Sequence, residues 1–130
     1  MNQSEIIESN SQVIETWKYF TSHFPSTENT EVDGLTITWS NTENILLNII
    51  FVSKPVLNEA DLETRIKAAC DYAKQYGKPW MMVVCENWLG EQILPEASEI
   101  FARHELPLFT NFIGKAKTYR THLVSLHSEV

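Results

Sequence analysis

Two short, nearly continuous apolar runs, separated by one amphipathic pattern, constrain the fold of this chain more than any other feature. The first run covers residues 44–52 (Asn-Ile-Leu-Leu-Asn-Ile-Ile-Phe-Val) and the second covers Trp80–Cys85 (Trp-Met-Met-Val-Val-Cys). Runs of this length, rich in β-branched residues, are typical of strands covered on both faces. Residues 58–76 between them carry an apolar stripe at helical spacing. The three segments predict a βαβ unit with two parallel strands.

Capping signals mark both ends of the helix predicted at residues 58–76. Asn58 is a good N-cap residue, and Asp61 follows it three positions later. At the other end, Gly77 stands where a C-terminal glycine cap belongs, and Pro79 follows. The helix is therefore predicted with defined bounds.

The residues before this unit predict a helix, a loop and one more strand. Residues 4–24 carry apolar side chains at spacings of three, four and seven, which predicts a helix. Residues 28–34 read as a polar loop that ends in an Asp-Gly turn signal. Leu35–Trp39 alternates apolar with polar residues, which predicts a half-exposed strand near a sheet edge, paired antiparallel with residues 44–52.

The residues after the unit predict a helix at 95–104 and a long strand at 106–117. The expected order is helix, strand, strand, helix, strand, helix, strand. The fold class is α/β (α+β), with a mixed β-sheet that has a central parallel pair and flanking helices. We expect one domain over residues 1–130: an N-terminal helix within 1–25, a core at 35–117 and a tail at 118–130.

Length and charge narrow the classes of function. A chain of 130 residues is enough for one domain with its own core. The net charge of -7 disfavours nucleic acid and other polyanions as partners. Residues 1–12 do not have the pattern of a signal peptide, and no apolar run approaches the ~20 residues of a membrane span. We therefore expect a cytoplasmic protein with no membrane partner.

A candidate ligand site lies where the two parallel strands end. Ligands of open sheets bind at the carboxyl ends of such strands. This rim combines a cation, a carboxylate, an amide and an indole, which suits a small ligand, and Glu86 is a weak candidate for a general base if burial raises its pKa. Ordinary loop residues at a strand end are the alternative interpretation. The rim residues are Val52, Ser53, Lys54, Cys85, Glu86, Asn87 and Trp88.

Other reactive residues give weaker patterns. Cys85 would need an activating base to act as a nucleophile, and no histidine is near it in sequence, so a structural role is favoured. His104, His122 and His127 do not have the spacing of metal ligands, so no metal is predicted. His104 is expected at a helix end, where it complements the helix dipole.

The one basic cluster in the sequence comprises Lys115, Lys117 and Arg120. These side chains could hold a carboxylate or phosphate, or attract an acidic partner. A solvated strand end that protects a sheet edge is the alternative, and the favoured one.

A family resemblance covers residues 35–117, about two-thirds of the chain. The segments that carry it are Asn44-Ile45-Leu46-Leu47-Asn48, Ala60-Asp61-Leu62, Pro79-Trp80-Met81-Met82-Val83-Val84 and Leu94-Pro95-Glu96-Ala97, leading to Phe101 and Leu106. In this order they resemble the core of the GNAT acetyltransferase superfamily. More narrowly, they resemble the degenerate N-terminal half of two-domain GNAT proteins.

The resemblance implies a specific loop for acetyl-CoA, and this chain departs from it. Catalytic GNAT domains bind the pyrophosphate on a Gln/Arg-x-x-Gly-x-Gly/Ala loop that opens the next helix. The matching residues 53–58 read Ser-Lys-Pro-Val-Leu-Asn and contain no glycine. Pro55 lacks an N–H donor, Val56 and Leu57 add bulk, and Asn58 is needed as a cap. A second, smaller departure is that His104-Glu105 stands where the family usually ends the later helix with glycine. No cofactor is therefore predicted.

Three functions follow from this reading. The first is a GNAT-like accessory, substrate-side or dimerising module that is not an autonomous enzyme. The second is an active N-acetyltransferase that uses acetyl-CoA through an atypical loop, and the third is an unrelated small-ligand or protein-binding module. The expected partners are a second copy or a separate protein, together with an unknown small ligand. The family inserts a further strand that only residues 121–126 could supply here, and a second copy's strand would fill this gap if the tail does not fold back. Leu35 and Trp39 could also form an oligomer surface.

Overall fold

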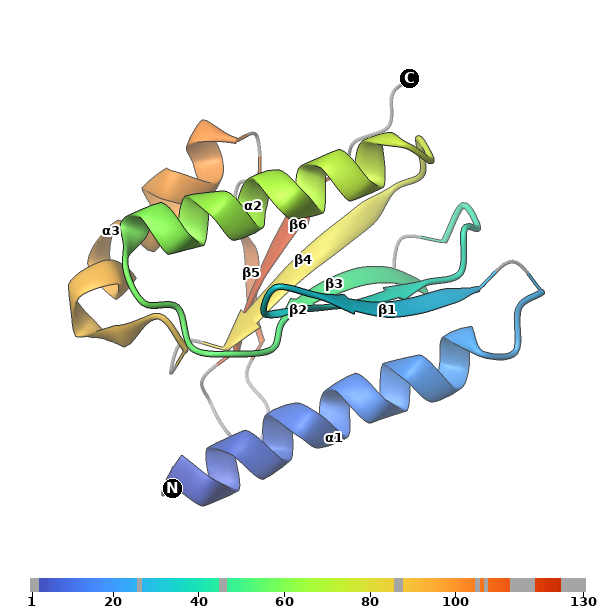
Figure 1. The fold of residues 1–130 in the computed structure, drawn as a ribbon, viewed down its shortest axis with the longest axis horizontal. Coiled ribbons are helices and arrows are strands. Elements are labelled where there is room, and N and C mark those ends of the chain that lie inside the picture. Colours follow the sequence, from blue (N-terminus) through green and yellow to red (C-terminus); the bar gives the residue numbers. More distant parts are fainter. Residues whose placement is uncertain are drawn as a thin grey trace.

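The computed structural model contains three helices and a six-stranded mixed sheet with strand order β1-β2-β3-β4-β6-β5 among its described residues (Figure 1). It describes residues 3–25, 27–44, 47–85, 88–104, 106, 108–112 and 119–124. The elements are α1 (Gln3–Thr21), β1 (Glu28–Val32), β2 (Leu35–Trp39), β3 (Asn48–Val52), α2 (Glu59–Lys74), β4 (Trp80–Cys85), α3 (Gly90–Arg103), β5 (Leu108–Phe112) and β6 (Tyr119–Val124).

The predicted βαβ unit is confirmed. β3 and β4 pair in parallel, with Ile50 opposite Met82, and α2 connects them. The Asn58 side chain accepts a hydrogen bond from the Asp61 N–H at 2.8 Å, so the predicted N-cap is also confirmed. Gly77 has φ +61° and its N–H donates to the Ala73 carbonyl, as expected for a glycine that ends a helix.

The helices cover opposite faces of the sheet (Figure 1). α2 packs on the face that carries Trp39, whose ring lies 5.3 Å from that of Tyr72 and 5.6 Å from that of Tyr76. α1 packs on the other face, where Lys18 forms an ion pair with Glu31 of β1. Because side chains alternate along a strand, Thr36 and Thr38 of β2 face α1.

β1 corrects the prediction of a polar loop at residues 28–34. Every residue of this edge strand is exposed, so Glu28–Val32 needs no alternation of apolar and polar residues, and its sequence shows none. It is held by contacts that are distant in sequence: the hydroxyls of Tyr72 in α2 and of Tyr76 just after that helix donate to the Glu28 carboxylate. Burial first, and then the bond to Glu28, raise the pKa of Tyr72 above its ordinary value.

β2 lies next to the edge strand β1, which agrees with its predicted position near a sheet edge, but the predicted half-exposure is wrong. It lies between β1 and β3, and all five of its residues are buried. Leu35 is 1% exposed and Trp39 is fully buried, so the predicted oligomer surface at these two residues is wrong.

The C-terminal part also differs from the prediction. Only Leu108–Phe112 of the strand predicted at 106–117 is β5, and residues 113–118 lie outside the described residues. The predicted tail contains β6, which pairs with both β4 and β5. The chain's own strand therefore fills the position that a second copy's strand would take only if the tail did not fold back. α3 begins at Gly90, five residues before the prediction, so Pro95 lies inside the helix.

One buried amide organises the entry to both parallel strands. Asn48 is fully buried, and its Oδ1 accepts from Ser40 N at 3.2 Å and Asn41 N at 3.0 Å. Its Nδ2 donates to the carbonyls of Thr42 at 2.8 Å and Pro79 at 2.9 Å. The polar residue that interrupts the apolar run therefore joins the β2–β3 loop to the start of β4.

We predict that Asn48→Ala lowers the free energy of unfolding by about 2–4 kcal/mol, because it leaves several buried backbone groups without partners. Urea unfolding measures this loss. Gln92→Ala, which removes an exposed amide from α3, is the control and should change stability by less than about 0.5 kcal/mol. Equal effects of the two substitutions would contradict the role of Asn48.

Candidate functional site

The structure divides the predicted rim between the two faces of the sheet. Val52 is 1% exposed at the end of β3, whereas Ser53 and Lys54 line a pocket on the α1 side. Trp88 is buried, and its indole N–H has no partner among the described residues. Cys85 ends β4, and its side chain is not described. Glu86 and Asn87 lie outside the described residues, so the structure does not test the candidate base.

A backbone hydrogen bond joins the two halves of the rim. The Val56 N–H donates to the Trp88 carbonyl at 2.7 Å, and both residues are 7% exposed. The segment that leaves β3 is thereby bonded to the segment that leaves β4. The space at the ends of the parallel strands is bridged by the chain itself.

Arg65 of α2 holds the loop at residues 53–58 in place. Its side chain is almost wholly buried, and Nη1 donates to the Lys54 carbonyl at 2.6 Å. Nη2 donates to the Pro55 carbonyl at 2.7 Å and to Asp61 Oδ2 at 2.9 Å, while Nε donates to Asp61 Oδ1 at 3.3 Å. One guanidinium therefore fixes two loop carbonyls and one helix carboxylate. We call Arg65, Asp61 and the loop carbonyls that they bind the arginine clamp.

Asp61 brings a negative charge to the N-terminus of α2. Its Oδ2 also accepts from the Leu57 N–H at 2.9 Å. Burial on its own raises the pKa of Asp61. The Leu57 hydrogen bond and the hydrogen bond and charge of Arg65 outweigh this, so the pKa lies below its ordinary value. The carboxylate is therefore ionised at neutral pH and occupies the positive end of the helix dipole.

The turn between β1 and β2 closes over the clamp. Gly34 has φ +83°, and a Cβ built on it would lie 2.8 Å from Arg65 Cζ. Its carbonyl accepts from the Ser53 N–H at 2.8 Å. The glycine is required here both by its backbone conformation and by the close approach of the guanidinium. The Asp-Gly signal in the sequence thus marks a turn that packs on the clamp.

These contacts decide whether a pyrophosphate fits the loop. A phosphate group needs free backbone N–H donors and a helix N-terminus without a competing anion. Here Ser53, Val56 and Leu57 donate their N–H groups to other parts of the chain, and Pro55 has none. Asp61 already supplies the anion. The residues present do not fit the pyrophosphate of acetyl-CoA.

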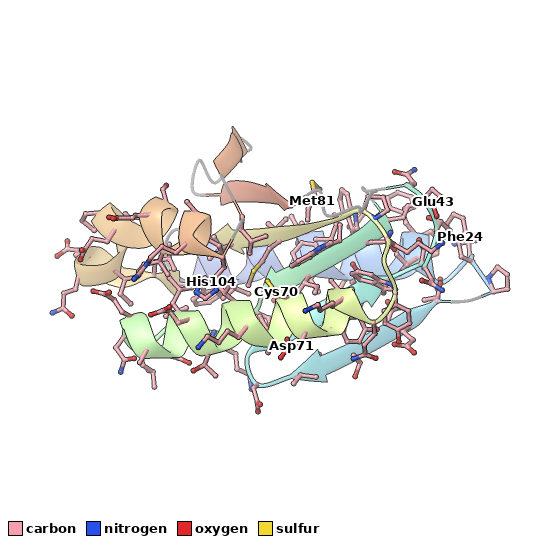
Figure 2. All side chains as sticks on the ribbon, turned by 90° about the horizontal axis from the view of Figure 1, so that it is seen from above. Phe24, Glu43, Cys70, Asp71, Met81 and His104 are labelled. Atoms are coloured by element: carbon pink, nitrogen blue, oxygen red, sulfur yellow. The ribbon has the colours of Figure 1, made fainter. Side chains whose placement is uncertain are left out.

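His104 lies between the two helices of one sheet face (Figure 2). Its Nε2 is 3.0 Å from Glu63 Oε1 of α2, and that hydrogen bond is the main cause of a lowered pKa of Glu63. The expected position at a helix end is confirmed, because His104 is the C-cap residue of α3. The contact ties α3 to α2.

The described side chains do not test the remaining predicted residues. Lys115, Lys117 and His127 lie outside the described residues, and only the backbone of Arg120 and His122 is described, in β6. Across the described side chains, no group of three or more His, Cys, Asp or Glu residues could hold a metal ion. No described helix is long and apolar enough to cross a membrane.

Sequence reasoning missed Arg65 because it lies beside the apolar stripe of α2 and looks like a surface residue. The sequence did contain one indication of the pair: Asp61 and Arg65 are four residues apart, which is the spacing of an ion pair on one helix face. The burial of Arg65 depends on Gly34 and on the loop after β3, which the helix pattern does not contain. No protein-family model, curated protein or solved structure matches this chain.

We predict that Asp61→Asn lowers the free energy of unfolding by about 1–3 kcal/mol at pH 7. The folded-state pKa of Asp61 is lowered from 3.8, so its stabilisation is complete above pH 3.8 and is lost as pH falls further. The difference between variant and wild type should therefore shrink in acid. Urea unfolding from neutral pH to strong acid measures it.

Glu59→Gln is the matched control for this series. Glu59 is an exposed carboxylate in the same helical turn, and none of the described residues pairs with it. Its substitution should leave stability almost unchanged. A loss in Asp61→Asn that stays constant down to strong acid would contradict the assigned role of the carboxylate.

Proposed function

We propose that this chain is a GNAT-like domain that is degenerate for acetyl-CoA chemistry. It acts as an accessory, substrate-side or dimerising module rather than as an autonomous enzyme. Its partner is a second copy of the chain or a separate protein.

The arrangement of the strands supports the GNAT-like part of this proposal. β1, β2 and β3 are antiparallel neighbours, and α2 carries the chain from β3 to the parallel strand β4. After α3, β6 pairs with β4 on one side and with β5 on the other. An inserted strand beside the strand that follows the later helix is what the resemblance implies.

The observation that carries the degenerate part is the arginine clamp. The loop that would cradle the pyrophosphate directs its carbonyls of Lys54 and Pro55 to Arg65. The carboxylate of Asp61 stands at the helix N-terminus and takes the Leu57 N–H, which is then not available to a phosphate. An atypical N-acetyltransferase would have to break these contacts and the Val56–Trp88 bond before it could bind acetyl-CoA.

We predict that the full chain shows no saturable heat with acetyl-CoA up to about 1 mM in isothermal titration calorimetry. A catalytic GNAT domain with a glycine-bearing loop, titrated in parallel, controls for the quality of the ligand. The absence of binding follows from the occupied N–H donors and the resident carboxylate. Binding at micromolar strength would overturn the proposal in favour of the acetyltransferase alternative.

A further inference from the structure

A separate pocket of about 190 Å³ lies between α1 and the sheet, on the face opposite to α2. It does not rest on the proposed function: the arginine clamp binds the backbone carbonyl of Lys54 on the α2 side, whereas the pocket lies on the α1 side. Glu15 and Lys18 come from α1, and Glu31 comes from β1. The sheet side supplies Thr36 of β2 and the two residues after β3, Ser53 and Lys54.

The charges of the pocket are divided between its walls. Lys18 Nζ lies 3.3 Å from Glu15 Oε2 and 3.6 Å from Glu31 Oε2. One ammonium between two carboxylates leaves negative charge in excess on the side of α1 and β1. Lys54 is exposed, and within the described part of the chain no carboxylate pairs with it. The opposite wall is therefore positive.

The hydroxyl group of Thr36 opens into the pocket. Thr36 is 3% exposed as a residue and lines the pocket, and within the described part of the chain no hydrogen bond of its hydroxyl is found. Thr38, two positions along the same face, donates to the Ile49 carbonyl at 3.0 Å. The Thr36 hydroxyl is not among the enclosed polar atoms of the described residues that lack a partner, so it is accessible from the pocket, where water or the polar group of a ligand can bond to it.

We propose that this pocket binds a small zwitterion, namely a free α-amino acid. Its carboxylate accepts from Thr36 and Ser53 and pairs with Lys54, while its ammonium group lies near Glu15 and Glu31. The volume of about 190 Å³ suits a ligand of this small size, since pockets for drug-sized ligands are larger, roughly 300–1,000 Å³. Opposite charges on facing walls favour a ligand that carries both charges over one that carries either alone.

NMR titration of the ¹⁵N-labelled full chain tests the proposal with three matched probes. L-alanine carries both charges, propionate lacks the ammonium group and ethylamine lacks the carboxylate. We expect L-alanine to shift the amide signals of Thr36, Ser53 and Lys54 saturably, with a Kd in the millimolar range, and each half-probe to bind at least about tenfold more weakly. No saturable shift with L-alanine, or equal binding of propionate, would overturn the proposal.

Variants separate a contact from a general effect of charge. Lys54→Met should weaken L-alanine binding about tenfold. Lys67→Met makes the same charge change at an exposed site on α2 and should leave binding unchanged. Thr36→Val keeps the shape of the buried side chain and should weaken binding several-fold, with unchanged signals elsewhere in the spectrum showing that the fold is intact. Equal weakening by Lys54→Met and Lys67→Met would overturn the assignment of Lys54 as a ligand contact.

Discussion

The buried guanidinium of Arg65 determines how the first strands and α2 fit together. It joins the loop after β3 to the start of α2, and Gly34 of the β1–β2 turn packs directly on it. Moving a charged group from water into the protein interior costs free energy, and hydrogen bonds with good geometry can offset that cost. Here Asp61 and the carbonyls of Lys54 and Pro55 provide this geometry. The contacts of Arg65 therefore fix the loop after β3, the start of α2 and the β1–β2 turn relative to one another.

The same arrangement limits the chemistry at the ends of the parallel strands. An anion site needs free N–H donors, whereas a tightly held loop uses its donors internally. In this chain, Asp61 takes the position at the helix N-terminus that suits a phosphate, and Val56 is bonded to Trp88. Stability of the loop and binding of a nucleotide coenzyme therefore compete for the same groups.

Sequence patterns predicted the elements whose stability is local or whose faces are uniformly apolar. α2 with its Asn58 cap, β3 and β4 belong to this class. β1 could not be predicted, because a polar edge strand without alternation looks like a loop until Tyr72 and Tyr76 bind Glu28. β6 likewise depends on pairing with strands that are distant in sequence. Of the predicted rim, Ser53 and Lys54 line a pocket whose other residues come from α1, β1 and β2, and helix and strand patterns do not show that these elements meet there.

For β2, the sequence pattern predicted the strand correctly but predicted its exposure to solvent wrongly. Its alternation of apolar and polar residues is real, but the polar face is turned towards α1 rather than towards solvent. Thr38 is satisfied within the sheet by Ile49, whereas Thr36, two residues earlier, has no partner in the described chain and lines the pocket. Because the two threonines share one face and differ only in position along the strand, the boundary between core and pocket lies between them. Alternation identifies the polar face of a strand, and only the packing of another element decides whether that face borders solvent, core or a binding site.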